Sequence, residues 1–163
     1  MAGGAAAPLR RAACVPEGPL NRPSLELTVA INHAVRGPDE WFDEPDDLDR
    51  VRRALDAVTE IDEPIRASAT LAYRITRAQG FGEANKRTAF LVAKWTLDHN
   101  GVDGGRLIPP DDRQFADLLV KASMGRDVEL EIVRLFRGRA LGLGVEPRPV
   151  APTRSTGREP HGR

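Results

Sequence analysis

The residues with the clearest chemical potential lie in one stretch, residues 79–88, which reads QGFGEANKRT. Its glycines allow the backbone to come close to a ligand. Its basic pair, Lys86 and Arg87, stands where an apolar run begins that we expect to be a helix. A helix N-terminus carries unpaired N–H groups and a partial positive charge, so basic side chains delivered there can surround an anion. The stretch therefore predicts an anion site, for which phosphate is the natural ligand.

Individual side chains in this stretch suit different parts of such a site. Arg87 can clamp phosphate oxygens through two donors, and Lys86 adds a point charge. Asn85 can cap the helix or contact a phosphate, and Gly82 brings the backbone near. Glu83 is a hard oxygen ligand suited to Mg²⁺. We predict that Gly82, Asn85, Lys86 and Arg87 bind phosphate or nucleotide and that Glu83 holds the metal.

The same stretch resembles the signature of the Fic/Doc family, His-x-Phe-x-Asp/Glu-Gly/Ala-Asn-Gly/Lys-Arg. The matching residues are Phe81, Glu83, Ala84, Asn85, Lys86, Arg87, Thr88 and Ala89. The lysine marks the Doc-like branch, and the likeness continues downstream to about Phe136. It implies an all-α, single Fic/Doc-like helical domain built around a central buried helix, with a site that handles nucleotides.

One signature position differs, because Gln79 stands where the family has the histidine that acts as its general base. An amide donates and accepts hydrogen bonds but does not take up a proton near neutral pH. Phosphoryl and nucleotidyl transfer depend mostly on positioning and charge neutralisation. The cradle and the metal ligand are therefore present and the base is missing. Gln79, at the motif position, and Lys86 are our candidates for catalytic positions.

Three functions are compatible with these residues. The first is a Doc-like transferase that moves phosphate or AMP from ATP or another NTP, with Mg²⁺, to a protein hydroxyl. The second is a non-catalytic relative that binds a nucleotide or an antitoxin-like partner, as in toxin–antitoxin pairs. The third is an enzyme that acts on a phosphorylated or nucleotide-linked small molecule. The sequence ranks neither the targets nor the nucleotide base.

Each of these residues also has a purely structural interpretation. Phe81 fits a buried anchor, Asn85 a cap, and Glu83 a charge that favours the helix dipole. Arg87 fits a partner for the segment 39–63, which holds eleven acidic residues against three arginines. Taken singly these interpretations are the better ones, but the spacing of all four residues together favours anion binding.

The composition is that of an ordinary globular protein. A chain of 163 residues with 40% hydrophobic and 29% charged residues suits one compact domain. Its 24 basic and 24 acidic residues cancel, which argues against binding nucleic acid by bulk charge. No apolar run approaches a membrane span, and the single Cys14 fits a reducing compartment. We expect a cytoplasmic protein with no membrane or nucleic-acid partner.

The elements that must position the site are predicted to be helices. A disordered leader is expected over 1–23, the Fic/Doc-like helical domain over 24–141 and a disordered tail over 142–163. Apolar periodicity predicts helices over 24–36, 46–60, from 64 to the signature loop, and over 88–99, 111–123 and 127–141. The last two are expected to open on aspartate caps, and Leu48 and Leu130 to face the core.

Two further residue sets lie outside the signature. His33 falls on the first helix, where a structural histidine is favoured over a catalytic one. The loop 37–45 carries Trp41 and Phe42, which we expect to pin it to the core. The family resemblance implies that such a loop is a flap for docking the target.

The tail contains one approximate match to a known inhibitory pattern. Fic proteins are often blocked by a helix with Ser/Thr-x-x-x-Glu-Gly/Asn, and Ser155 to Glu159 approaches this spacing. Pro160 follows directly, and the surroundings are rich in glycine and arginine. We predict no built-in inhibitor there.

Overall fold

The computed structural model describes residues 18–41 and 45–144. Within these ranges the chain forms seven helices and no strand, which confirms the all-α fold class. No helix in these ranges is long and apolar enough to cross a membrane. The helices are α1 Leu25–Val35, α2 Leu48–Asp56, α3 Pro64–Ala78, α4 Asn85–Asp98, α5 Gly104–Leu107, α6 Arg113–Ser123 and α7 Glu129–Gly142.

Several predictions fall on residues outside these ranges. They are the leader up to residue 17 with Cys14, the ring of Phe42, and the tail from residue 145 with its segment Ser155 to Glu159. These stay predictions.

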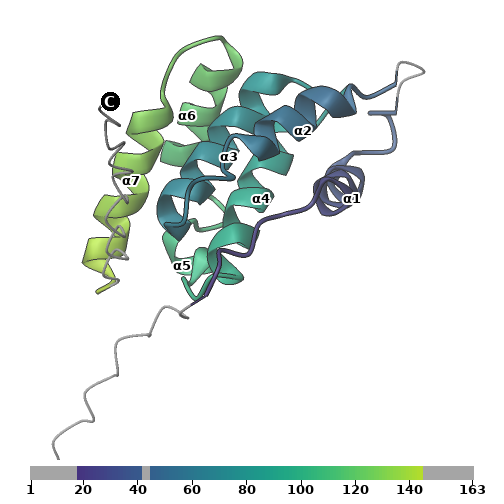
Figure 1. Ribbon diagram of the computed structural model, residues 1–163. Coiled ribbons are helices and arrows are strands. Elements are labelled where there is room, and N and C mark those ends of the chain that lie inside the picture. Colours follow the sequence, from purple (N-terminus) through teal and green to yellow (C-terminus); the bar gives the residue numbers. More distant parts are fainter. Residues whose placement is uncertain (1–17, 42–44, 145–163) are drawn as a thin grey trace, which may run out of the picture.

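The centre of the fold is the pair α3 and α4, with α1 on one side and α7 on the other (Figure 1). The two central helices meet through small side chains such as Ala69, Ala72 and Ala93, all without exposed surface. Ser68 adds a hydrogen bond from its Oγ to the carbonyl of Ala93 at 2.8 Å. Small residues let helix backbones approach closely, so the loop that joins α3 to α4 has a rigid base.

The core consists of two apolar clusters on opposite faces of α3. One joins α3 and α4 to α6 and α7, and its large members include Tyr73, Leu97, Phe115, Ile132 and Phe136. The other joins α3 and α4 to α2 and to the segment before α1 through Leu20, Val58, Leu71, Ile75 and Val92. Helix α3 is buried on nearly all sides, whereas α4 leaves Leu91 38% exposed. The central element is thus a pair rather than α4 alone.

Helix starts follow the expected capping chemistry at most positions. The side chains of Ser24, Asp47 and Asp112 accept hydrogen bonds from backbone N–H groups in the first turns of α1, α2 and α6. The cap of α6 lies one residue after the predicted start at Asp111. The predicted cap at Asp127 is wrong, because α7 begins two residues later with Val128 at the N-cap and no side-chain cap. Val128 is buried and has φ −121° and ψ 14°, outside the helical region, so the helix begins after it.

Other predicted boundaries and faces also need correction. The leader was expected to reach residue 23, but Leu20 is buried in the core and the Asn21 N–H donates to Asn100 Oδ1 at 2.8 Å. Leu48 is 37% and Leu130 57% exposed, because α2 and α7 present other residues to the core. Helix α4 begins at Asn85 rather than Thr88, and the short α5 was not predicted.

One glycine of the loop after α3 is required by packing. A Cβ at Gly80 would lie 2.6 Å from Val51 Cγ2 and 2.9 Å from the Asp47 carbonyl oxygen, both at the start of α2. The Asp47 N–H also donates to the Gly80 carbonyl at 2.7 Å. The loop and the start of α2 therefore cannot move apart to make room for a Cβ without losing this hydrogen bond.

We expect Gly80→Ala to lower the free energy of unfolding by about 1–3 kcal/mol through this overlap. The control is Gly138→Ala in α7, where an added Cβ meets nothing within 4 Å. It should raise stability by about 0.5–1 kcal/mol, since alanine favours the helix. Urea unfolding of both variants measures the difference, and equal midpoints would contradict the packing argument.

Candidate functional site

The signature stretch forms a tight connection between α3 and α4. Gln79 at the end of α3 has φ 47° and Ala84 at the start of α4 has φ 63°, so both adopt the left-handed conformation that side chains disfavour. This conformation costs on the order of 1 kcal/mol for each such residue. Surrounding contacts must therefore hold the loop in place.

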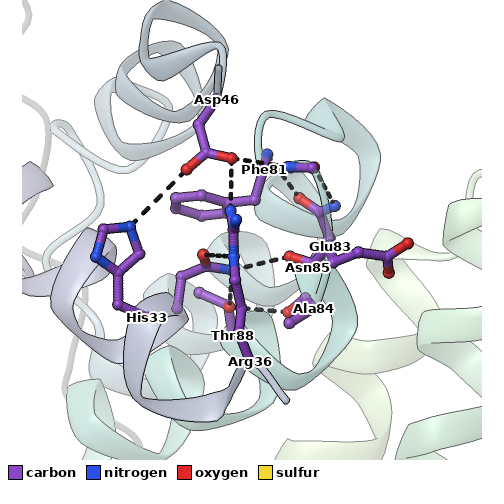
Figure 2. Close-up of polar contacts among 10 residues, drawn as sticks. His33, Arg36, Asp46, Phe81, Glu83, Ala84, Asn85 and Thr88 are labelled. Carbon is purple, nitrogen blue, oxygen red and sulfur yellow. Dashed lines mark hydrogen bonds and ion pairs between the residues drawn. The ribbon is translucent and has the colours of Figure 1, made fainter. Parts of the chain in front are cut away.

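Helices α1 and α2 supply part of this support. Asn32 of α1 is fully buried, and its Nδ2 donates to the Glu83 carbonyl and to Thr88 Oγ1, each at 3.0 Å. Asp46, just before α2, accepts a hydrogen bond from the Gly82 N–H at 2.8 Å (Figure 2). Two elements distant in sequence thus fix successive backbone groups of the loop.

Helix α4 supplies the rest of the support from its own first turn. The Asn85 side chain accepts from the Phe81 N–H at 3.1 Å and donates to the Phe81 carbonyl at 2.8 Å. Thr88 Oγ1 donates to the Ala84 carbonyl at 2.8 Å. In this structure the Asn85 amide braces the loop, while its proposed contact with a phosphate stays a prediction. Phe81 is buried, in agreement with its interpretation as an anchor.

The first turn of α4 has the properties expected of an anion site. It has no side-chain cap and no acidic residue, so its backbone N–H groups are not neutralised from within the turn. Lys86 and Arg87 are both exposed there. The structure therefore brings the predicted basic pair and an open helix N-terminus to one place at the surface.

Arg87 is held by α1 and by the loop that follows it. Its guanidinium donates to the Val35 carbonyl and to Glu40 Oε1, each at 2.5 Å. Glu40 also accepts from the Gly37 N–H at 2.6 Å. The Arg87 hydrogen bond, followed by that from Gly37, holds the pKa of the Glu40 carboxyl below its ordinary value. A phosphate that binds Arg87 must compete with this carboxylate.

A second charged cluster lies on the α1 side of the loop and centres on Asp46 (Figure 2). Arg36 is only 4% exposed in its side chain and pairs with Asp46 Oδ1 at 2.5 Å. His33 Nε2 lies 3.9 Å from Asp46 Oδ2. Burial alone would raise the pKa of Asp46, but the hydrogen bonds from Gly82 and Arg36 outweigh it and lower that pKa.

Trp41 closes this cluster from outside. Its ring meets His33 edge-on with centroids 5.0 Å apart, and the Arg36 guanidinium lies 4.8 Å from the ring centroid. The ring is 51% exposed, so Trp41 pins its loop to α1 rather than to the core. His33 keeps 46% of its side chain exposed beside this ring.

Among the described residues, the Gln79 side chain contacts only its own helix. Its Nε2 donates to the Thr76 carbonyl at 2.6 Å, and the side chain is otherwise at the surface. The amide holds the end of α3 and provides no proton acceptor.

Glu83 is the single acidic residue within the signature. Its carboxylate has no hydrogen bond or ion pair to another described residue, and within 18–41 and 45–144 no cluster of three or more acidic, histidine or cysteine side chains could hold a metal. Mg²⁺ usually binds through one or two carboxylates and the phosphates of a substrate. The donor set therefore fits a Mg²⁺ that arrives with a nucleotide.

Four residues of this site were not predicted from the sequence as parts of it: Asn32, Arg36, Glu40 and Asp46. A buried asparagine on an apolar helix face and the dense acids of segment 39–63 were the available signals. Neither signal says which acid meets which base, because the partners lie more than ten residues apart along the chain in most of these pairs.

Comparison with known proteins gives one match. The model of the Fic/DOC family matches residues 20–97, which run from the buried Leu20 to the last turn of α4 and include the whole signature loop. No curated protein and no solved structure matches the chain.

We expect Glu40→Gln to tighten binding of pyrophosphate a few-fold, because it removes the carboxylate that competes for Arg87. Since the pKa of Glu40 is lowered, the pair is complete above the ordinary carboxyl pKa and is lost only as pH falls through the lowered value. The wild type should therefore show no Glu40-dependent change between neutral and mildly acid pH. Calorimetry measures this, with Glu26→Gln on α1 as the control. Weaker binding in Glu40→Gln would contradict the competition.

Proposed function

Because residues 20–97 of this chain belong to the Fic/DOC family, we propose that the protein transfers phosphate or AMP from ATP or another NTP to a protein hydroxyl. The observation that carries the proposal is the first turn of α4, which is uncapped, free of acidic residues, and flanked by exposed Lys86 and Arg87. Preorganised donors of this kind are the main source of catalysis in phosphoryl transfer.

The phosphate contacts follow from this arrangement. The α4 backbone N–H groups form the floor of the cradle, and Arg87 and Lys86 supply the positive charge. The Gly82 N–H is engaged by Asp46, so Gly82 contributes by letting the backbone pass close to the phosphate. Arg87 reaches the phosphate after it leaves Glu40. The Asn85 side chain holds the loop through its two hydrogen bonds with the backbone of Phe81. Its part in binding is therefore to keep the loop in the conformation that forms the cradle.

Glu83 is the residue that would hold Mg²⁺ when a nucleotide is bound. The ion neutralises charge on phosphate oxygens. The Asn32 side chain fixes the Glu83 backbone carbonyl, and the Glu83 carboxylate has no hydrogen bond or ion pair to another described residue.

The missing proton acceptor is the main chemical question, and we assign it to His33. An imidazole is the side chain that exchanges protons near neutral pH. His33 lies beside Asp46, whose other oxygen holds the Gly82 N–H, so the ring stands next to the loop and has a carboxylate to orient it. Arg36 is the cation that faces the same carboxylate, and Trp41 limits the motion of the ring.

The hydroxyl oxygen of the target attacks phosphorus, and its proton passes to His33. The bond from that phosphorus to the leaving phosphate oxygen breaks, and ADP leaves in phosphate transfer or pyrophosphate in AMP transfer. Lys86 and Arg87 stabilise the charge that develops on the phosphate oxygens.

The binding part of this proposal is tested with two substitutions. Arg87→Ala should weaken ATP binding about tenfold or more with or without Mg²⁺, whereas Glu83→Ala should weaken it mainly when Mg²⁺ is present. Arg106→Ala, an exposed arginine of α5, is the matched control. Calorimetry at two Mg²⁺ levels separates the effects, and unchanged affinity in both variants would leave only the structural interpretation of these residues.

The catalytic part is tested by removing the histidine at position 33 and placing one at position 79. His33→Asn should lower labelling of lysate proteins by about 10²- to 10⁴-fold, the usual effect of a general base, and adding Gln79→His should restore it. Histidine tolerates the left-handed conformation of position 79 better than most residues. His99→Asn, at the far end of α4, should change nothing. ATP labelled on its γ or its α phosphate distinguishes phosphate from AMP transfer.

Two outcomes of that experiment decide against the assignment. Equal labelling by His33→Asn and wild type would remove His33 as the base. No labelling by wild type or by Gln79→His, with intact ATP binding, would favour the alternative that this is a non-catalytic protein that binds a nucleotide or an antitoxin-like partner.

A further inference from the structure

A groove of about 790 Å³ opens between α4 and α6, next to the anion site. Ile108 and Leu119, both almost fully buried, belong to its apolar lining. Leu91 and Val120 also line it and are 38% and 43% exposed. This volume lies in the usual range for small-molecule sites, roughly 300–1,000 Å³. Exposed aliphatic side chains in a concave surface indicate a site for an apolar ligand.

The charges of the groove are mainly positive. Lys86 and Arg87 line it at the first turn of α4, Lys94 lies two turns further along α4, and Arg113 stands at the start of α6. Lys86 and Arg113 have no ion-pair partner among the described residues. Lys94, in contrast, is paired with Asp98, and Arg87 is paired with Glu40.

The acidic lining does not cancel this charge. Asp112 is buried, caps α6 and pairs with Arg139, whose guanidinium neutralises it. Burial would raise the pKa of Asp112, but the hydrogen bonds from Arg139 and the Phe115 N–H outweigh it and lower that pKa. Asp111 is the single other acidic residue of the lining.

We propose that this groove binds an organic phosphate with an extended apolar body, an alkyl phosphate being the simplest example. The phosphate lies at Lys86 and Arg87, and the body lies along α4 and α6 over Leu91 and Val120. The site rests on the phosphate cradle of the proposed function and names a ligand class for the same anion site. Eight residues of α4 separate Lys86 from Lys94, about 12 Å along the helix axis, which gives room for a chain rather than a compact group.

The lining favours an alkyl body over a nucleoside. A nucleobase carries several hydrogen-bonding groups on its edge, and leaving them without partners in an apolar site is costly. The side chains that form the groove between its charged ends are aliphatic or aromatic: Val35, Phe90, Leu91, Ala116, Leu119 and Val120. Burial of each methylene there gives a favourable contribution and leaves no polar group without a partner.

The experiment measures the affinity of the full-length protein for hexyl, octyl and decyl phosphate below their micelle concentrations, by calorimetry. Affinity should rise about threefold per methylene, since each buried CH₂ contributes a constant increment. Octyl glucoside, which lacks the phosphate, should bind at least tenfold more weakly than octyl phosphate. Inorganic phosphate should compete with octyl phosphate.

Substitutions locate the ligand. Ala116→Trp fills the groove from α6 and should weaken octyl phosphate binding at least tenfold, and Lys86→Gln should weaken it by removing the head-group charge. Ala57→Trp, on an exposed alanine that ends α2, is the matched control and should bind as the wild type does. Thermal unfolding of each variant confirms that it is folded.

The outcomes separate this inference from the proposed function. ATP binding without octyl phosphate binding would overturn the groove and leave the nucleotide site in place. Octyl phosphate binding that Ala116→Trp abolishes, without ATP binding, would support the groove and count against the NTP donor. The proposal would be overturned if the affinity for alkyl phosphates did not change with chain length. It would also be overturned if Ala116→Trp left octyl phosphate binding unchanged.

Discussion

The organisation of this protein depends on the need to satisfy the backbone of a short loop between two closely packed helices. Six hydrogen bonds meet this need, two of them from Asn85 and one each from Asn32, Asp46, Asp47 and Thr88. Each unsatisfied buried group would cost about 1–3 kcal/mol, which is a large part of the stability of a small domain. The positions of α1 and α2 are therefore tied to the loop, and the loop in turn presents the N-terminus of α4 to solvent.

The same contacts determine the electrostatics of the site. Carboxylates of the acidic segment do not simply surround the basic pair, because Asp46 is engaged by Arg36 and the loop while Glu40 is engaged by Arg87. One acid thus supports the loop and lies beside His33, and the other holds Arg87. The Arg87 side chain is 49% exposed and that of Arg36 only 4%, so solvent screens the Glu40 contact more than the Asp46 contact.

The central helix pair also explains why one side of α4 is left open. Helix α3 contacts neighbours on both faces, but α4 is covered by α1, α3, α5 and α6 only in part, and Leu91 and Val120 remain at the edges of a groove. Lys86 and Arg87 belong both to the lining of this groove and to the first turn of α4.

The sequence by itself was sufficient for the helical fold, for the approximate starts of the first helices and for the placement of Lys86 and Arg87 at a helix N-terminus, because these follow from local periodicity and from a run of adjacent residues. Helices α1, α2 and α3 begin within two residues of the predicted positions 24, 46 and 64. The buried face of each helix was harder to predict. Leu48 and Leu130 were expected in the core but are exposed, because the sequence of a helix does not show on which side its neighbours pack. Only the tertiary structure decided that Asn32 braces the loop, that Glu40 holds Arg87, and that His33 meets Asp46. These pairs join residues that the chain separates, and their identity depends on how α1 and α2 pack against the α3–α4 pair.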